Sequence, residues 1–129
     1  MTKVLLDASA ITALIKEEPG ADEVSAALPD AIMSAVNVTE AIRVLQRFNF
    51  THNEATENLS FLIGEVIPFD REQSYYAARL EPIARRFGLS LGDCVCLSLA
   101  QKLNIKVLTS DTAWLLAVPE IGVDVKLIR

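Results

Sequence analysis

The sequence is poor in the residues that build disulfides and zinc sites. Its 129 residues include two cysteines and one histidine. Cys94 and Cys96 are two positions apart in a segment with helical character, so their side chains point in different directions and cannot form a disulfide without unwinding the helix. His52 is remote in sequence from both thiols, which argues against zinc. We predict two buried free thiols in a reducing compartment.

The chain also lacks a long apolar run. Although 51% of its residues are hydrophobic, no stretch approaches the about 20 apolar residues that span a bilayer. The acidic Asp7 stands where a signal peptide would still be apolar. These absences predict a cytoplasmic protein that does not bind a membrane.

Basic residues are in the minority. The chain has 12 Lys and Arg residues and 17 Asp and Glu residues, which gives a net charge of −5. Phosphate contacts normally come from Lys and Arg, so the balance argues against nucleic-acid binding through charge alone. That objection weakens if several acids surround a divalent cation, because the cation reverses their local field.

Short apolar segments alternate with helical patterns along the chain. The strand-like segments are Lys3–Leu6, Ala31–Ser34, Val66–Phe69, Lys106–Thr109 and Val125–Ile128. The helical patterns are Ala8–Glu17, Ala21–Leu28, Val38–Phe48, Glu54–Ile63, Arg71–Phe87, Leu91–Leu103 and Thr112–Ala117. Pro82 predicts a kink or short break in the longest of these helices.

This alternation predicts a parallel sheet with right-handed crossovers and helices on both faces. The chain length suits one domain, and no linker or repeat divides the sequence. We therefore predict a single α/β domain over residues 1–129, built on a mostly parallel five-stranded sheet.

Four acidic residues lie at the ends of predicted strands or near the starts of predicted helices. They are Asp7, Glu40, Asp93 and Asp111. Taken singly, each is explained by helix capping: Asp7 and Asp111 as N-caps, and the other two as acids three residues after Asn37 and Ser90.

Capping does not explain why the four acids are placed together. In open parallel sheets, ligands bind outside the carboxyl ends of the strands, where the strand order reverses. If the first and fourth strands are neighbours there, Asp7 and Asp111 meet, and Glu40 and Asp93 point toward them. Acids so close would repel each other, and Mg²⁺ or Mn²⁺ would relieve the repulsion.

The segments that carry these acids resemble the motifs of PIN-domain ribonucleases, specifically VapC-like toxins of bacterial and archaeal toxin–antitoxin pairs. The segment from Val4 to Ala10 resembles the opening strand with the first acid, and Ser34 to Glu40 resembles the second motif. Leu91 to Asp93 and Leu108 to Trp114 resemble the third and fourth. The ordered set covers essentially the whole chain.

The resemblance implies a PIN-like three-layer domain and a metal-dependent endoribonuclease toxin. It implies that Asp7, Glu40, Asp93 and Asp111 are the catalytic and metal-binding residues, with Mg²⁺ or Mn²⁺ as the cofactor. Ser9 and Thr109 are implied as supporting contacts. The implied partners are an RNA substrate, a cognate antitoxin that docks near the active site, and a second copy in a homodimer.

Two alternatives stand beside this interpretation. A Mg²⁺-dependent phosphoacceptor signalling domain would need adjacent acids after the first strand, an acceptor Asp after the third and a Lys after the fifth. This chain offers only Asp7, Asp70 and Arg129 at those places. The other alternative is a catalytically inactive PIN-like module that binds RNA or a partner.

Overall fold

The computed structural model describes residues 2–129 and contains one five-stranded sheet. Its strands are β1 (Val4–Leu6), β2 (Ala31–Ser34), β3 (Glu65–Ile67), β4 (Lys106–Thr109) and β5 (Val125–Leu127). All four neighbouring pairs are parallel, in the order β3-β2-β1-β4-β5. The predicted five strands are confirmed, and the sheet is wholly rather than mostly parallel.

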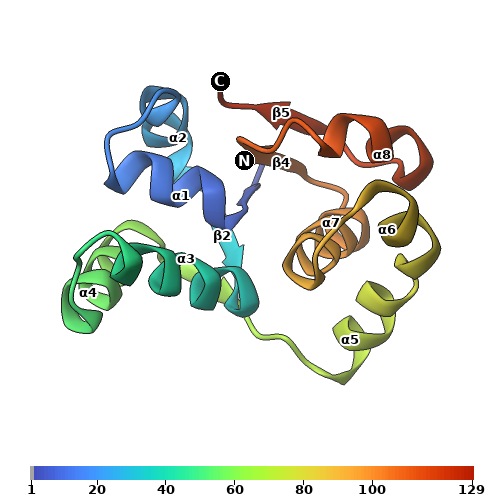
Figure 1. The fold of residues 1–129 in the computed structure, drawn as a ribbon, viewed down its shortest axis with the longest axis horizontal. Helices are drawn as coiled ribbons and strands as arrows, with labels where there is room; N and C mark the ends of the chain where they lie inside the picture. Colours follow the sequence, from blue (N-terminus) through green and yellow to red (C-terminus); the bar gives the residue numbers. More distant parts are fainter. Residues whose placement is uncertain (1) are drawn as a thin grey trace.

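Helices cover both faces of this sheet, as predicted. The first group is α1 (Ala8–Ile15), α2 (Ala21–Ala27), α3 (Ala35–Arg47) and α4 (His52–Leu62), with a short 3-10 helix at Leu28–Asp30. The second group is α5 (Arg71–Ala78), α6 (Glu81–Phe87), α7 (Leu91–Leu103) and α8 (Trp114–Ile121). Figure 1 shows the first group to the left of the strands and the second to the right.

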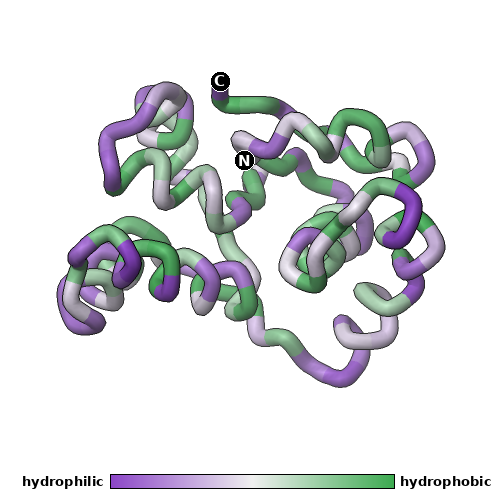
Figure 2. Tube along the Cα trace, viewed as in Figure 1, coloured by the Kyte–Doolittle hydropathy of each residue, from purple (hydrophilic) through white to green (hydrophobic). Residues whose placement is uncertain are grey.

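Alternation along the central strands sends apolar side chains into two separate cores. On β1, Leu5 packs into the core beneath α5–α8 and Leu6 into the core beneath α1–α4, and both are fully buried. On β4, Val107 and Leu108 divide in the same way. In Figure 2 hydrophobic stretches run along the inner strands, and hydrophilic stretches gather at outer turns. Each fully buried Leu contributes about 1.5–3 kcal/mol.

Helix α7 forms the centre of the second core. Cys94 and Cys96 are both buried and free, as predicted. Every residue of the helix from Cys94 to Ala100 is buried, which agrees with its apolar sequence. Within residues 2–129, no helix combines the length and apolarity that a membrane crossing needs.

Three helix boundaries depend on local chemistry. The predicted break near Pro82 is confirmed, because the chain divides into α5 and α6 and the proline lies in the first turn of α6. The predicted Val38 start was wrong, since Ser34 caps α3 and its hydroxyl accepts from the Val36 N–H. The predicted bounds Thr112–Ala117 were also wrong, since the last helix begins at Trp114, runs past Pro119 and ends where Gly122 adopts a left-handed conformation with φ 78°.

The strand order reverses between β1 and β4. From β1 the chain winds outward to β2 and β3, and β4 and β5 then fill the opposite side. In open parallel sheets, such a reversal is where ligands usually bind, and here it lies at the carboxyl ends of β1 and β4. The order also differs from the 2-1-3-4-5 sheet of the phosphoacceptor class. Asp70, the only candidate acceptor, caps α5 beyond the edge strand β3.

Candidate functional site

A hollow of about 300 Å³ lies at the reversal point of the sheet. It is lined by Asp7, Ala8, Ser9, Thr12, Asn37, Glu40, Val44, Asp93 and Asp111. All four predicted acids are therefore in its wall. Two follow the neighbouring strands β1 and β4, and the others come from α3 and α7, so the fold brings together residues from both ends of the sequence.

Asp7 is the most constrained of these acids. It caps α1, and its Oδ1 accepts from the Ala10 N–H at 2.9 Å and from the Ser9 hydroxyl at 2.7 Å. Its Oδ2 accepts from the Thr109 hydroxyl on β4 at 2.6 Å. A carboxylate offers about four lone pairs, so Oδ2 keeps one for a further ligand.

Burial has the largest effect on the pKa of Asp7, which is only 6% exposed. Desolvation raises its pKa from 3.8 to about 6, although hydrogen bonds from Thr109, Ser9 and Ala10 lower it. The charge of Asp93 raises it further. The fold thus holds a carboxylate where ionisation is unfavourable unless a cation is near.

Asp93 belongs to the capping box of α7, as predicted. Its Oδ2 accepts from the Ser90 N–H at 2.9 Å, and the Ser90 hydroxyl accepts from the Asp93 N–H. Desolvation raises the Asp93 pKa, hydrogen bonds with Ser90 lower it, and the charge of Asp111 raises it. The buried Trp114 indole lies close enough to lower this pKa, but its N–H forms no hydrogen bond within residues 2–129.

Glu40 is placed differently from the prediction. It lies in the second turn of α3 rather than in a capping position. Buried Asn37 donates from Nδ2 to Glu40 Oε1 at 2.7 Å and to the Gly92 carbonyl at 3.2 Å. Both partners are acceptors, which fixes the amide orientation. Asn37, predicted as a helix cap, instead ties the Glu40 carboxylate to the start of α7.

Asp111 is not the N-cap of α8, because the helix begins after Ala113. Its carboxylate accepts from the Ala113 N–H at 3.0 Å, which closes a turn ahead of the helix. Its own N–H donates to Thr109 Oγ1 at 3.0 Å. Thr109 therefore connects Asp111 with Asp7 through one buried hydroxyl.

The donor atoms at this hollow suit a hard cation. The four acids and the Asn37 amide provide oxygen, and the amide Oδ1 is buried without a hydrogen-bond partner in the described chain. Among residues 2–129, no group of three or more His, Cys, Asp or Glu side chains is placed to hold a metal ion. Mg²⁺ retains waters and needs only one or two carboxylates, so an open oxygen site fits it, and Mn²⁺ takes similar ligands.

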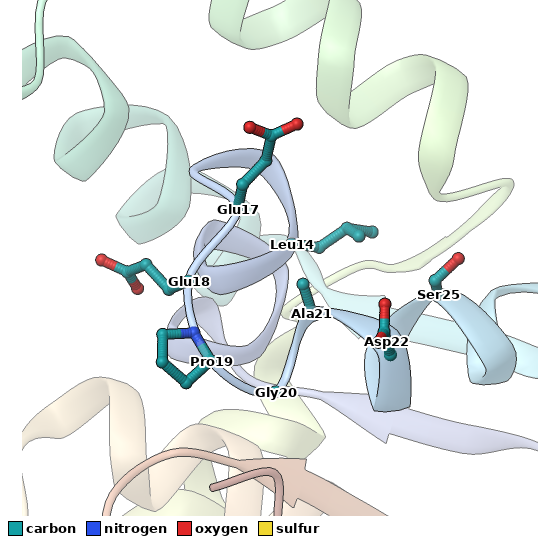
Figure 3. Close-up of a pocket in the computed structure, with 8 residues that line it drawn as sticks. All are labelled: Leu14, Glu17, Glu18, Pro19, Gly20, Ala21, Asp22 and Ser25. Carbon is teal, nitrogen blue, oxygen red and sulfur yellow. The ribbon is translucent and has the colours of Figure 1, made fainter.

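A larger hollow, about 510 Å³, lies at the turn between α1 and α2. Figure 3 shows its Glu17 and Glu18 side chains directed away from each other and from Asp22. Glu18 is paired with Lys16 and Arg129. These acids do not converge, and this hollow is not a candidate site.

Comparisons with known proteins agree with the fold. The PIN domain family matches residues 4–120. Comparison with curated proteins gives no match. Among solved structures, a chain of FitAcB from Neisseria gonorrhoeae has 24% identity and a TM-score of 0.70, with 95% of each chain covered. A chain of DNA-bound VapBC from Salmonella typhimurium has 16% identity and a TM-score of 0.73, with 100% of each covered.

A third similar structure is a VapBC-5 chain from Mycobacterium tuberculosis, described as a member of the VapBC family of toxin–antitoxin systems. It has 20% identity and a TM-score of 0.62, with 100% of this chain and 99% of that chain covered. These likenesses support the three-layer fold, and the family match covers most of the sequence. The resemblance seen in the four acidic motifs is confirmed, and the chain belongs to the PIN domain family.

Proposed function

We propose that this chain is a Mg²⁺- or Mn²⁺-dependent endoribonuclease and the toxin of a VapC-like toxin–antitoxin pair. The observation that carries the proposal is the position of four carboxylates around one hollow at the sheet reversal. The PIN family match supports nuclease chemistry, and the VapBC neighbours support the toxin assignment. The RNA substrate would be met in the cytoplasm.

In this proposal Asp7 and Asp93 are the principal metal ligands, directly or through water. Glu40 holds a second ion or orients the attacking water, and Asp111 completes the cluster. When bound, the cation lowers the pKa of a coordinated water and stabilises negative charge on the phosphate. In this scheme water attacks the phosphorus, the bond to the 3′-oxygen breaks and that oxygen takes a proton, which leaves a 5′-phosphate and a 3′-hydroxyl without using the 2′-hydroxyl.

The surrounding residues prepare the carboxylates for this task. The hydroxyls of Ser9 and Thr109 donate hydrogen bonds to the Asp7 carboxylate and hold it in one orientation. Asn37 does the same for Glu40. Such preorganisation reduces the rearrangement needed when a cation and a phosphate arrive.

An adjoining hollow of about 380 Å³ offers a place for the substrate backbone. It shares Glu40 with the acidic hollow and is also lined by Arg43 on α3. Arg43 is exposed and forms no salt bridge within the described chain, whereas Arg86 is paired with Glu120. Among the basic residues of these helices, Arg43 is therefore the best placed to contact a phosphate.

Exposed leucines on α7 and α8 support a protein partner. Leu91 at the start of α7 is 72% exposed, and Leu116 on α8 is 70% exposed. Large apolar side chains at a surface are typical of interaction sites when they form a patch. We propose a cognate antitoxin and a second copy of this chain as the partners.

Asp93→Asn tests the proposed function. It keeps an oxygen that can accept from Ser90 but removes the charge, so RNA cleavage should fall at least about 100-fold in Mg²⁺. Cleavage of total RNA by purified proteins measures this, with exposed Asp124→Asn as the matched control and excess EDTA as the metal test. Full activity in Asp93→Asn, or activity in EDTA, contradicts the proposal. RNA binding without cleavage by the wild type would favour the inactive binding module.

Asp7→Asn should stabilise the metal-free protein near neutral pH. Because the folded pKa of Asp7 is raised from 3.8 to about 6, the folded state binds the Asp7 proton more tightly than the unfolded state does. The stability that this proton provides is present at low pH and is lost as pH rises from 3.8 to about 6. Each pKa unit corresponds to about 1.4 kcal/mol, giving roughly 3 kcal/mol across this window. Asparagine is also a good N-cap, so the start of α1 should persist.

Thermal unfolding in EDTA at about pH 4 and about pH 7.5 measures this effect. The Tm of Asp7→Asn should exceed that of the wild type at the higher pH, and the difference should shrink at the lower one. Added Mn²⁺ should raise the Tm of the wild type more than that of the variant. Equal destabilisation of the variant at both pH values would refute the account of Asp7.

Arg43→Ala should weaken RNA binding in a salt-dependent manner. Loss of one phosphate contact lowers the slope of log affinity against log salt by up to about one unit. Binding to RNA in Ca²⁺ or EDTA, over a range of NaCl concentrations, measures the slope. Arg47→Ala on the same helix is the matched control, and equal slopes for the two variants would exclude a special role for Arg43.

A further inference from the structure

The carboxylate of Glu40 occupies the space above the first turn of α7. A Cβ atom built at Gly92 would lie 2.5 Å from Glu40 Oε1 and nearer still to Cδ and Oε2. No ordinary packing contact is that short, because nonbonded carbon atoms settle at about 3.5–4.0 Å. The space left by the missing side chain is filled by the Glu40 carboxylate.

Gly92 is in an unusual place for a glycine. It is buried inside α7 as the second helical residue, and its backbone does not adopt a positive φ. A glycine within a helix is less favourable than alanine, because it loses more backbone freedom on folding. Neither a turn nor a left-handed conformation requires glycine here. The steric demand of Glu40 is the requirement that the structure does show.

Asn37 also holds the Glu40 carboxylate next to Gly92. Its amide donates to Glu40 Oε1 and to the carbonyl of Gly92, so the carboxylate is held against the glycine backbone. Displacing the carboxylate from the glycine would break this hydrogen bond. A side chain at position 92 would therefore push the carboxylate out of the orientation in which it lines the acidic hollow.

We infer that Gly92 is a positioning residue for Glu40: the lack of a side chain at this position admits the carboxylate to the metal site. The effect of Gly92 on metal binding rests on the proposed function, because the position of Glu40 matters only if the hollow is a metal site. The steric coupling itself does not depend on a metal. This distinction allows the two parts to be tested separately.

A double-mutant cycle in EDTA tests the steric part, using Gly92→Ala, Glu40→Ala and the double variant. With Glu40 shortened to alanine, Gly92→Ala should raise the Tm by about 2–4 °C, as expected for replacing a helical glycine. With Glu40 present, that gain should be lost or reversed. The same Tm change in both backgrounds overturns the inference.

Mn²⁺ binding to the folded proteins tests the functional part. Gly92→Ala should weaken Mn²⁺ binding by at least about tenfold, comparable to disturbing an outer-shell partner of a metal site. Gly64→Ala is the matched control, since a Cβ atom at Gly64 meets nothing within 4 Å. If wild-type protein binds no Mn²⁺, the proposed function fails and the EDTA cycle still decides the steric coupling. If Mn²⁺ binding needs Glu40 but Gly92→Ala leaves it unchanged, the inference is wrong.

Discussion

The burial of the Asp7 carboxylate between β1 and β4 is the constraint on which the site depends. Hydroxyls of Ser9 and Thr109 and the Ala10 N–H hold it from both strands' ends. These hydrogen bonds lower the pKa of Asp7, but desolvation raises it by more, so the pKa is about 6. Around neutral pH the fold therefore keeps an unfavourable buried charge. Such a charge is readily explained if the working state contains a cation, which would convert the unfavourable burial into binding affinity.

The remaining acids are organised around that carboxylate by different local means. Asp93 uses a helix capping box, Asp111 uses a turn, and Glu40 uses a neighbouring amide. Helix capping and metal binding are compatible here, because each carboxylate has more lone pairs than the fold consumes. The charge of Asp111 raises the pKa of Asp93, and that of Asp93 raises the pKa of Asp7. This electrostatic chain connects residues that are far apart in sequence.

Much of this arrangement was predictable because it follows local rules. Apolar alternation indicated the five strands, and the acids after β1 and β4 indicated a site where the strand order reverses. The position of Glu40 was not predictable in the same way. It depends on Asn37, which holds Glu40 and also donates to the Gly92 carbonyl, so that α3 is joined to α7 across 55 residues of sequence. The start of α3 was also misplaced, because a strand followed at once by a capped helix leaves no loop to mark the boundary.

In the proposed function, the hollow between β1 and β4 binds a divalent cation through its carboxylates. The most direct measurement is anomalous X-ray scattering from crystals of the wild-type protein grown with Mn²⁺. We predict a manganese peak inside the hollow, next to Asp7 and Asp93, that is lost in the Asp7→Asn variant. An empty hollow at saturating Mn²⁺, or a peak that persists unchanged in the variant, would contradict the account.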